Sequence, residues 1–325
     1  MLRTGVIGTG SMGKNHVRLH SELANLVGVF DIDRAQAKKV ADRFNVKVFD
    51  SVDDMLGQVD AISVCTTTTN HFDCTMKALL AGKSVLLEKP FTGDPTTASE
   101  LCQVAEREGV TLAAGFLERF NPVVSAVQKA VQAGTFGRII SLASRRVSSL
   151  PSRIRDVGAI MDLGTHDVDV LRYISSTEVE AVFALGGMIS NPKFEDNANI
   201  LMEMGNDIIG FVEINWLTPM KVRKVSLTCS GGFVQLDYMD QSLEFSSSTM
   251  GEIDSTNGFR VPLEYDVHRI SVRKEEPLKR ELEDFFRAAE SHSEPFVGCR
   301  EAVADLKVCH AALDSLAQRK RITIE

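Results

Sequence analysis

A glycine-rich turn near the amino terminus constrains this chain more than any other feature. The turn reads Gly8-Thr9-Gly10-Ser11-Met12-Gly13, with the spacing G-x-G-x-x-G, and it follows an apolar run over residues 4–7. An amphipathic segment comes next, and a second apolar run over residues 26–30 ends at Asp31. Strand, glycine turn, helix, strand and acid, in that order, predict a dinucleotide-binding βαβ unit.

Each glycine of the turn has its own expected role. Gly8 permits the tight turn, Gly10 lets the backbone approach a pyrophosphate, and Gly13 lets the helix pack closely on the strand. The amino terminus of the helix, with Ser11 and Met12 beside it, would face the phosphates with free N–H groups and the positive end of its dipole. The alternative is a glycine turn that binds nothing.

Asp31 is the expected selector of the dinucleotide. Its carboxylate can accept both ribose hydroxyls of NAD and would repel the 2′-phosphate of NADP. Arg34 could soften that preference, so NADP stays possible, although a solvated arginine in the first helical turn is the simpler alternative. A P-loop is the other reading of Gly8–Asn15, but Asn15 lacks the hydroxyl that a P-loop places on magnesium.

The first third of the chain alternates strand and helix. After Asp31 we expect strands over 47–49, 60–65, 84–87 and 110–114, and helices over 34–44, 50–56, 70–80 and 95–108. The inner face of the helix over 34–44 is predicted to hold Ala35, Val40, Ala41 and Phe44. Repeated β-α units of this size predict a doubly wound parallel sheet of the Rossmann type.

The pattern changes near residue 116. A helix is expected over 122–133, followed by strands over 139–144, 179–185, 198–203, 208–216, 224–229, 232–238 and 242–245, and by helices over 280–290 and 300–318 with a last strand over 321–324. Several of these strands alternate with period two, as in a sheet with one covered face. The sequence therefore predicts a nucleotide-binding Rossmann domain over 1–118. It predicts an α+β domain over 119–325, on a largely antiparallel open sheet suited to substrate binding and to homodimer or homotetramer formation.

Composition and charge indicate which kinds of partner and which cellular compartment to expect. The chain has 325 residues and a net charge of −8, which argues against a broad nucleic-acid or anionic-membrane surface. Its six cysteines include no C-x-x-C pair, so buried free thiols are expected rather than disulfides or zinc. No apolar run approaches the length of a membrane span, and a strand begins at once, so we expect a cytoplasmic protein.

Two further groups of polar residues follow strands of the parallel sheet, where such sheets bind ligands. The threonine run with Thr66 and Thr67 leads to His71, and Glu88-Lys89-Pro90 follows the next strand. A lysine placed there can donate a hydrogen bond to a substrate oxygen and stabilise the charge that develops on it. An ion pair between Lys89 and Glu88 is the structural alternative.

Asp162 and His166 form the next candidate pair. They are separated by four residues within a segment whose apolar residues recur at helical spacing, so they should share a face. An aspartate beside a histidine fixes the imidazole tautomer and raises its basicity, which suits a general base for an alcohol proton. A capping aspartate and a hydrogen-bonded core histidine are the alternative, and no further ligand cluster supports a metal site at Asp162, His166 and Asp169.

Together these motifs resemble the glucose–fructose oxidoreductase, inositol dehydrogenase and MocA family. The matching segments span essentially the whole chain: 8–13, 65–71, 81–90, 115–122 and 162–167. One departure is Thr68, where the family often has proline. The resemblance implies a nicotinamide-dependent sugar or polyol dehydrogenase in which Lys89 contacts the substrate hydroxyl, His166 is the acid/base and Asp162 assists it or binds the sugar. It also implies a cis peptide before Pro90 and a threonine loop that lies over the cofactor.

A local group of arginines bears on the substrate. Within residues 138–156 the basic residues are all arginines: Arg138, Arg145, Arg146, Arg153 and Arg155. Arginine suits bidentate phosphate contact, so we hypothesise an anionic substrate, most simply a nucleotide diphosphate sugar. Arg153 and Arg155, with Arg119 and Asn121, resemble the UDP-N-acetylglucosamine 3-dehydrogenase branch of the family. Ion pairs across a subunit interface are the alternative, and an inositol or free-sugar dehydrogenase and a non-catalytic NAD-binding sensor stay open.

Overall fold

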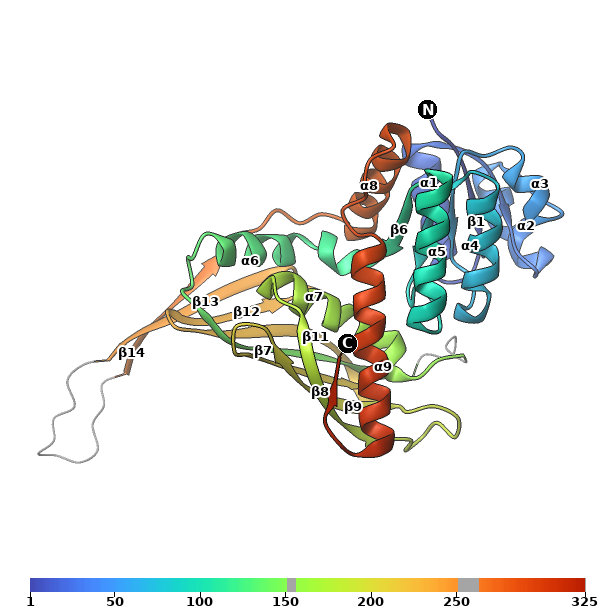
Figure 1. Cartoon of the computed structure of the whole chain (residues 1–325). Helices are drawn as coiled ribbons and strands as arrows, with labels where there is room; N and C mark the ends of the chain where they lie inside the picture. Colours follow the sequence, from blue (N-terminus) through green and yellow to red (C-terminus); the bar gives the residue numbers. More distant parts are fainter. Residues whose placement is uncertain (151–155, 251–262, 325) are drawn as a thin grey trace, which may run out of the picture. The chain divides into compact units, whose positions relative to one another are not determined.

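The computed structural model describes residues 1–150, 156–250 and 263–324, which form two compact units (Figure 1). Of the described residues, the first unit comprises 1–120, 156–166 and 276–310, and the second comprises 121–150, 167–250, 263–275 and 311–324. The first division thus falls at Phe120, close to the expected boundary at 118, but two later segments return to the first unit. The separate roles expected of the two domains stay a prediction.

The first unit is built on a six-stranded sheet in which every neighbouring pair is parallel. Its strands are β1 (Arg3–Ile7), β2 (Asn25–Phe30), β3 (Lys47–Val48), β4 (Ala61–Val64), β5 (Ser84–Glu88) and β6 (Leu112–Gly115). They lie in the order β3-β2-β1-β4-β5-β6, which confirms the doubly wound Rossmann sheet. Because the winding reverses between β1 and β4, a crevice opens beyond the carboxyl ends of these two strands.

Helices cover the sheet on both faces. Helices α1 (Gly13–Leu23), α2 (Arg34–Phe44) and α8 (Pro277–Ser291) pack apolar side chains against one face, where Leu19, Leu86 and Phe285 are buried together. Helices α4 (His71–Leu80) and α5 (Pro95–Glu108) contact each other and follow β4 and β5, so right-handed crossovers place them on the opposite face. The short α3 (Val52–Leu56) precedes β4, and α9 (Cys299–Gln318) follows α8.

Helix α2 corrects one detail of the predicted core. Its bounds are as predicted, but Ala35 is exposed and Ala37 is buried in its place. Ala37, Val40 and Ala41 follow the i, i+3, i+4 spacing of one helical face, whereas Ala35 lies two positions before Ala37 and so points to the other side.

The second unit is built on a nine-stranded sheet that is mostly antiparallel, with one parallel pair between β7 and β10. Its strands are β7 (Ile139–Ser149), β8 (Val179–Gly187), β9 (Asn197–Met204), β10 (Ile208–Asn215), β11 (Leu217–Cys229), β12 (Gly232–Asp237), β13 (Ser242–Met250), β14 (Leu263–Ile270) and β15 (Ile322–Thr323). Helices α6 (Pro122–Gln132) and α7 (Thr165–Ser175) complete the order. Buried and exposed residues alternate along β9 and β10, so one face of the sheet is covered and the other is open.

The prediction of free thiols at every cysteine is wrong for one pair. Cys102 of α5 and Cys299 at the start of α9 form a disulfide, with their Cα atoms 5.7 Å apart. The two residues are 197 positions apart in sequence, so no local spacing could reveal their proximity. Cys65, Cys74, Cys229 and Cys309 are free.

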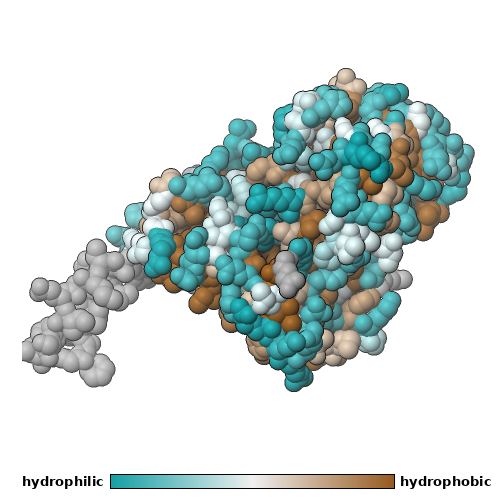
Figure 2. All heavy atoms as spheres, in the orientation of Figure 1, coloured by the Kyte–Doolittle hydropathy of each residue, from teal (hydrophilic) through white to brown (hydrophobic). Residues whose placement is uncertain are grey.

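Hydrophilic residues cover most of the side that Figure 2 shows, with smaller hydrophobic areas between them. Among the helices of the described residues, none is both long enough and apolar enough to cross a membrane.

Candidate active site

A cavity of about 450 Å³ lies in the first unit, beyond the carboxyl ends of β1, β2, β4 and β5. Most of the residues predicted from the glycine turn, the threonine loop and the Glu-Lys-Pro motif line it. The described lining residues are Ile7, Gly8, Gly10, Ser11, Met12, Phe30, Asp31, Ile32, Cys65, Thr66, Thr67, Thr68, Asn70, Cys74, Glu88, Lys89, Pro90, Asp156, Val157 and Asp162. The cavity therefore occupies the place where doubly wound sheets bind their ligands.

The physical reason for glycine differs among the three positions of the turn. Gly8 has φ +88°, and a Cβ there would lie 2.6 Å from the carbonyl oxygen of Cys65. A Cβ on Gly13 would lie 1.8 Å from the carbonyl oxygen of Gly8, so the turn and the helix can pack only without one. A Cβ on Gly10 would meet no described atom within 4 Å, so the protein's own packing does not require glycine there. Gly10 leaves open the side of the cavity where a pyrophosphate would approach the backbone.

Asp31 lies at the end of β2 and is held in place by neighbouring groups. Thr9 donates to its Oδ2 through both the backbone N–H (2.6 Å) and the hydroxyl (2.9 Å), and the N–H of Asp33 donates to Oδ1 (2.9 Å). A carboxylate has about four lone-pair sites, so Oδ1 keeps room for one further donor such as a ribose hydroxyl. Ile32, next to it, is 89 % exposed and offers an apolar surface at the cavity wall, which sequence reasoning missed.

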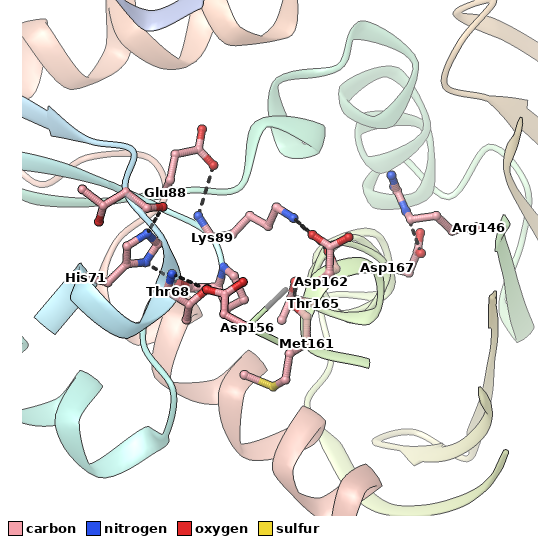
Figure 3. Close-up of polar contacts among 12 residues, drawn as sticks. Thr68, His71, Glu88, Lys89, Arg146, Asp156, Met161, Asp162, Thr165 and Asp167 are labelled. Carbon is pink, nitrogen blue, oxygen red and sulfur yellow. Dashed lines mark hydrogen bonds and ion pairs between the residues drawn. The ribbon is translucent and has the colours of Figure 1, made fainter. Parts of the chain in front are cut away.

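Lys89 follows β5 and points to Asp162 (Figure 3). Its Nζ donates to the Asp162 carboxylate at 2.5 Å and to the Asp162 backbone carbonyl at 2.9 Å. Both side chains are largely buried, at 12 % and 6 % exposed, so the ion pair is only weakly screened by solvent. The peptide between Lys89 and Pro90 is cis, as the resemblance implied.

Glu88 does not pair with the Lys89 ammonium; it lies against a buried histidine of α1. His16 Nε2 lies 2.9 Å from Glu88 Oε1, and His16 Nδ1 lies 3.0 Å from the hydroxyl of Ser63. Burial would raise the pKa of Glu88, but the hydrogen bond from His16, together with the charge and the backbone N–H of Lys89, holds it below its usual value. His16 was not among the predicted site residues. The one feature that could have indicated its role is its position on the inner face of α1, directly after the glycine turn.

His71, which we expected to contact the cofactor, instead contacts backbone carbonyl groups of the cavity wall. Its ring is buried, with Nδ1 2.8 Å from the Pro90 carbonyl oxygen and Nε2 3.2 Å from that of Thr66. Burial lowers the pKa of His71, so the ring is neutral and donates through one nitrogen only. The shorter contact assigns that N–H to Pro90.

The threonine loop is tied to the segment that leads to Asp162. The backbone N–H of Thr68 donates to the Asp156 carboxylate at 2.8 Å (Figure 3). A proline at position 68, common in the resembled family, could not make this bond because it has no N–H. Thr68 therefore changes the wall of the cavity as well as the stiffness of the loop.

The segment with Asp162 and His166 is helical, but its start is wound differently from the prediction. Ile160–Gly164 forms a π-helical turn before α7, and Asp162 and His166 are both buried. A π turn adds a residue to each turn of helix, so α-helical spacing does not fix which side chains meet. The described partner of the Asp162 carboxylate is Lys89.

The predicted basic residues are dispersed. Arg34 pairs with Asp50 at 2.5 Å on the surface. Arg145 pairs with Glu213, whereas Arg146 is buried in the core of the second unit, where its Nε donates to Asp167 at 2.8 Å. Arg145 and Arg146 have different surroundings because successive residues of a strand point to opposite faces of the sheet. The expectation that Arg146 contacts a phosphate is therefore wrong.

The remaining predicted substrate residues lie outside the cavity lining or outside the described residues. Arg119 is buried in the 3₁₀ turn Leu117–Phe120 of the first unit. Asn121, in the second unit, caps α6 through the N–H of Val123 and donates to the Tyr238 carbonyl at 3.2 Å. Arg153 and Arg155 lie outside the described residues.

The fold and the cavity together define a dinucleotide-binding oxidoreductase. Residues 2–116 match the oxidoreductase family with an NAD-binding Rossmann fold, and residues 124–235 match the GFO/IDH/MocA C-terminal domain. The UDP-N-acetylglucosamine 3-dehydrogenase of Acidithiobacillus ferrooxidans is 31 % identical over 96 % of this chain and 95 % of its own. The chain belongs to the Gfo/Idh/MocA family of NAD-dependent oxidoreductases, and NAD is its cofactor.

The chain is also similar to a solved structure of the same Acidithiobacillus enzyme and to one further relative. The solved structure of UDP-N-acetylglucosamine 3-dehydrogenase from Acidithiobacillus ferrooxidans superposes with a TM-score of 0.87 at 28 % identity, covering 98 % of both chains. An inositol 2-dehydrogenase of Acidothermus cellulolyticus is 30 % identical over 66 % of this chain and 66 % of its own.

Proposed function

We propose that this protein oxidises a secondary hydroxyl of a UDP-linked N-acetyl sugar and passes the hydride to NAD. The observation that carries the proposal is the ammonium of Lys89, which lines the cofactor cavity and is held by the carboxylate and carbonyl of Asp162. The full-length likeness to a UDP-N-acetylglucosamine 3-dehydrogenase supports the choice of sugar.

In the proposed mechanism, NAD supplies the hydride acceptor. Lys89 donates a hydrogen bond to the hydroxyl oxygen and stabilises the negative charge that develops there. Asp162 acts through Lys89, because its carboxylate and carbonyl fix the direction of the ammonium. His166 accepts the hydroxyl proton at a ring nitrogen. Gly8, Gly10, Ser11, Met12, Asp31, Thr66 and Thr67 would hold the dinucleotide.

The proposed anion contact rests on Arg153 and Arg155, since Arg145 and Arg146 have acidic partners in the second unit. Guanidinium groups bind pyrophosphate bidentately, so replacing either arginine should raise the KM for a UDP-sugar more than it lowers kcat. An unchanged KM in Arg153→Ala and Arg155→Ala would remove the pyrophosphate contact from the proposal.

Inositol or free-sugar oxidation is the second candidate, favoured by the inositol dehydrogenase relative. The two candidates separate in one experiment, in which purified protein and NAD are mixed with UDP-N-acetylglucosamine or with myo-inositol and the absorbance of NADH is followed. Reduction with the UDP-sugar supports the first candidate. Reduction of NAD with myo-inositol but not with the UDP-sugar would overturn the UDP-sugar proposal, while the proposed hydride transfer from a secondary hydroxyl to NAD would stand.

A further inference from the structure

Glu88 is a buried carboxylate in the wall of the cofactor cavity. Its side chain is 5 % exposed, and each oxygen has a donor: His16 Nε2 lies 2.9 Å from Oε1, and the backbone N–H of Lys89 lies 3.2 Å from Oε2. Two N–H donors stabilise the ionised form of a carboxylate. Glu88 is therefore a fixed negative charge at the carboxyl end of β5.

The hydrogen bonds behind Glu88 assign His16 as a neutral donor. The Ser63 hydroxyl lies 3.0 Å from His16 Nδ1 and 2.8 Å from His20 Nε2, while His20 Nδ1 is buried with no hydrogen-bond partner among the described residues. If His16 were an imidazolium, Ser63 would donate to His20 and leave His20 with a buried, unpaired N–H. With His16 neutral, every N–H and O–H of Ser63 and the two histidines has an acceptor, and orphaned buried N–H groups are rare. The Glu88–His16 pair then carries a net charge of about −1.

No cation of the described cavity wall neutralises this charge. Lys89 is the one lysine or arginine among the described lining residues, and its ammonium is bound to Asp162. The other ionised lining groups, Asp31 and Asp156, are carboxylates. A cationic ligand beside Lys89 would therefore meet an excess of negative charge.

The oxidised nicotinamide ring is such a cation, whereas the reduced ring is neutral. We propose that Glu88, bonded to His16 and to the Lys89 backbone, is the counter-charge that makes the cofactor site prefer NAD+ to NADH. The inference rests on the proposed function for one point only, that the nicotinamide lies beside Lys89. Preference for the oxidised cofactor would favour release of NADH after each turnover.

The test is the ratio of two dissociation constants, measured by titration calorimetry without substrate. Glu88→Gln keeps the shape of the side chain and removes the charge, so Kd(NADH)/Kd(NAD+) should fall about tenfold, as expected for loss of one nearby charge at intermediate dielectric. The Kd for ADP-ribose, which lacks nicotinamide, should stay within about twofold because the ribose and pyrophosphate contacts remain. Asp60→Asn is the matched control, because it removes a carboxylate just before β4, at the amino-terminal end of the strands, where Asp60 pairs with Arg3, and should leave the ratio unchanged.

An unchanged ratio in Glu88→Gln, or an equal loss of affinity for NAD+, NADH and ADP-ribose, would overturn the inference and assign Glu88 a purely structural role. If Glu88→Gln does not fold, His16→Leu replaces it: the variant removes the donor to Oε1, so the carboxyl protonates more readily and the ratio should shift in the same direction. An unshifted ratio there would overturn the inference equally. Failure of the wild-type protein to bind NAD+ at all would instead refute the proposed function.

Discussion

We propose that the Asp31 carboxylate selects NAD over NADP. Its Oδ2 accepts both hydrogen bonds from Thr9, and Oδ1 accepts one from the N–H of Asp33 and keeps one position free. A 2′-phosphate would meet this fixed charge, and the nearest predicted compensating cation, Arg34, is paired with Asp50. We expect Asp31→Ser to reduce the preference for NAD over NADP by about tenfold or more. Binding titrations with both cofactors measure this, and an unchanged preference would show that another residue makes the selection.

For single residues, the sequence predicted which side chains line the cavity better than it predicted which groups those side chains contact. Gly8, Gly10, Asp31 and Lys89 lie where their motif placed them, because a glycine turn and a strand end leave few conformations. The partner of Glu88 could not be predicted, since His16 is 72 positions away and meets it only through sheet packing. The prediction that Arg146 contacts a phosphate was wrong for a related reason, because a count of charged residues does not say which face of a strand each one occupies.

Asp196 holds the loop between β8 and β9 together. Its buried carboxylate accepts the backbone N–H groups of Ile189, Ser190 and Asn191. Burial would raise the pKa of Asp196, but the amide of Asn197 and these backbone donors bring it below its usual value. Because the folded pKa is the lower one, the carboxylate stabilises the fold above the unfolded pKa of about 3.9, and this contribution is lost as pH falls through the folded pKa.

Asp196→Asn should therefore cost about 1–3 kcal/mol in the free energy of unfolding at pH 7. The difference from wild type should shrink below pH 4 or so, where the wild-type carboxyl also becomes neutral. Urea denaturation at both pH values checks this, with the exposed Asp240 replaced by asparagine as the control. A difference that is the same at both pH values would mean that the charge of Asp196 is not what stabilises the loop.

The disulfide between α5 and the start of α9 ties the segment after α8 to the Rossmann sheet. Cys102 and Cys299 close a loop of 197 positions, and closing a loop of this size removes conformational freedom from the unfolded chain. We expect Cys102→Ser to destabilise the oxidised protein by about 2–4 kcal/mol. Reductant should lower the melting temperature of wild type and of Cys74→Ser, but not that of Cys102→Ser. Equal melting temperatures with and without reductant in the wild type would contradict this expectation.

At the scale of elements, local pattern was enough for helices with caps and for the parallel strands. The helix over 95–108 was bounded correctly because Asp94 caps it, Pro95 opens it and Gly109 closes it at φ +66°. The strand β14 was missed because its pairing with β13 is a long-range choice, and the π turn before α7 was missed because no periodicity distinguishes it from an α-helix. The strands β7 and β11 are also longer than predicted. Disulfides are uncommon in reducing compartments, so the expected cytoplasmic location also stays a prediction.

At the scale of the whole molecule, the open face of the nine-stranded sheet bears on assembly. Large apolar side chains from four strands lie on this face at 37–53 % exposure: Leu185, Leu201, Ile209, Phe211 and Phe233. An apolar patch of this kind favours association, and we propose that the protein forms a homodimer or homotetramer through it.

Phe211→Glu should weaken that association, because it places a charge at the centre of the patch. Light scattering should then show a mass moving toward the 35.7 kDa of one chain. Leu80→Glu, at a similarly exposed position on α4, should leave the assembly intact. A wild-type protein that is already monomeric at high concentration would refute the proposed interface.

The most direct test of the account is single-turnover hydride transfer in Lys89→Ala. Protein saturated with NAD+ is mixed rapidly with UDP-N-acetylglucosamine, and the appearance of NADH is followed, with Lys83→Ala at the other end of β5 as the control. We predict that Lys89→Ala slows transfer at saturating NAD+ by about 10²–10³-fold, since loss of one such donor costs this much. Transfer at the wild-type rate in Lys89→Ala would contradict the assignment of Lys89 as the group that polarises the substrate oxygen.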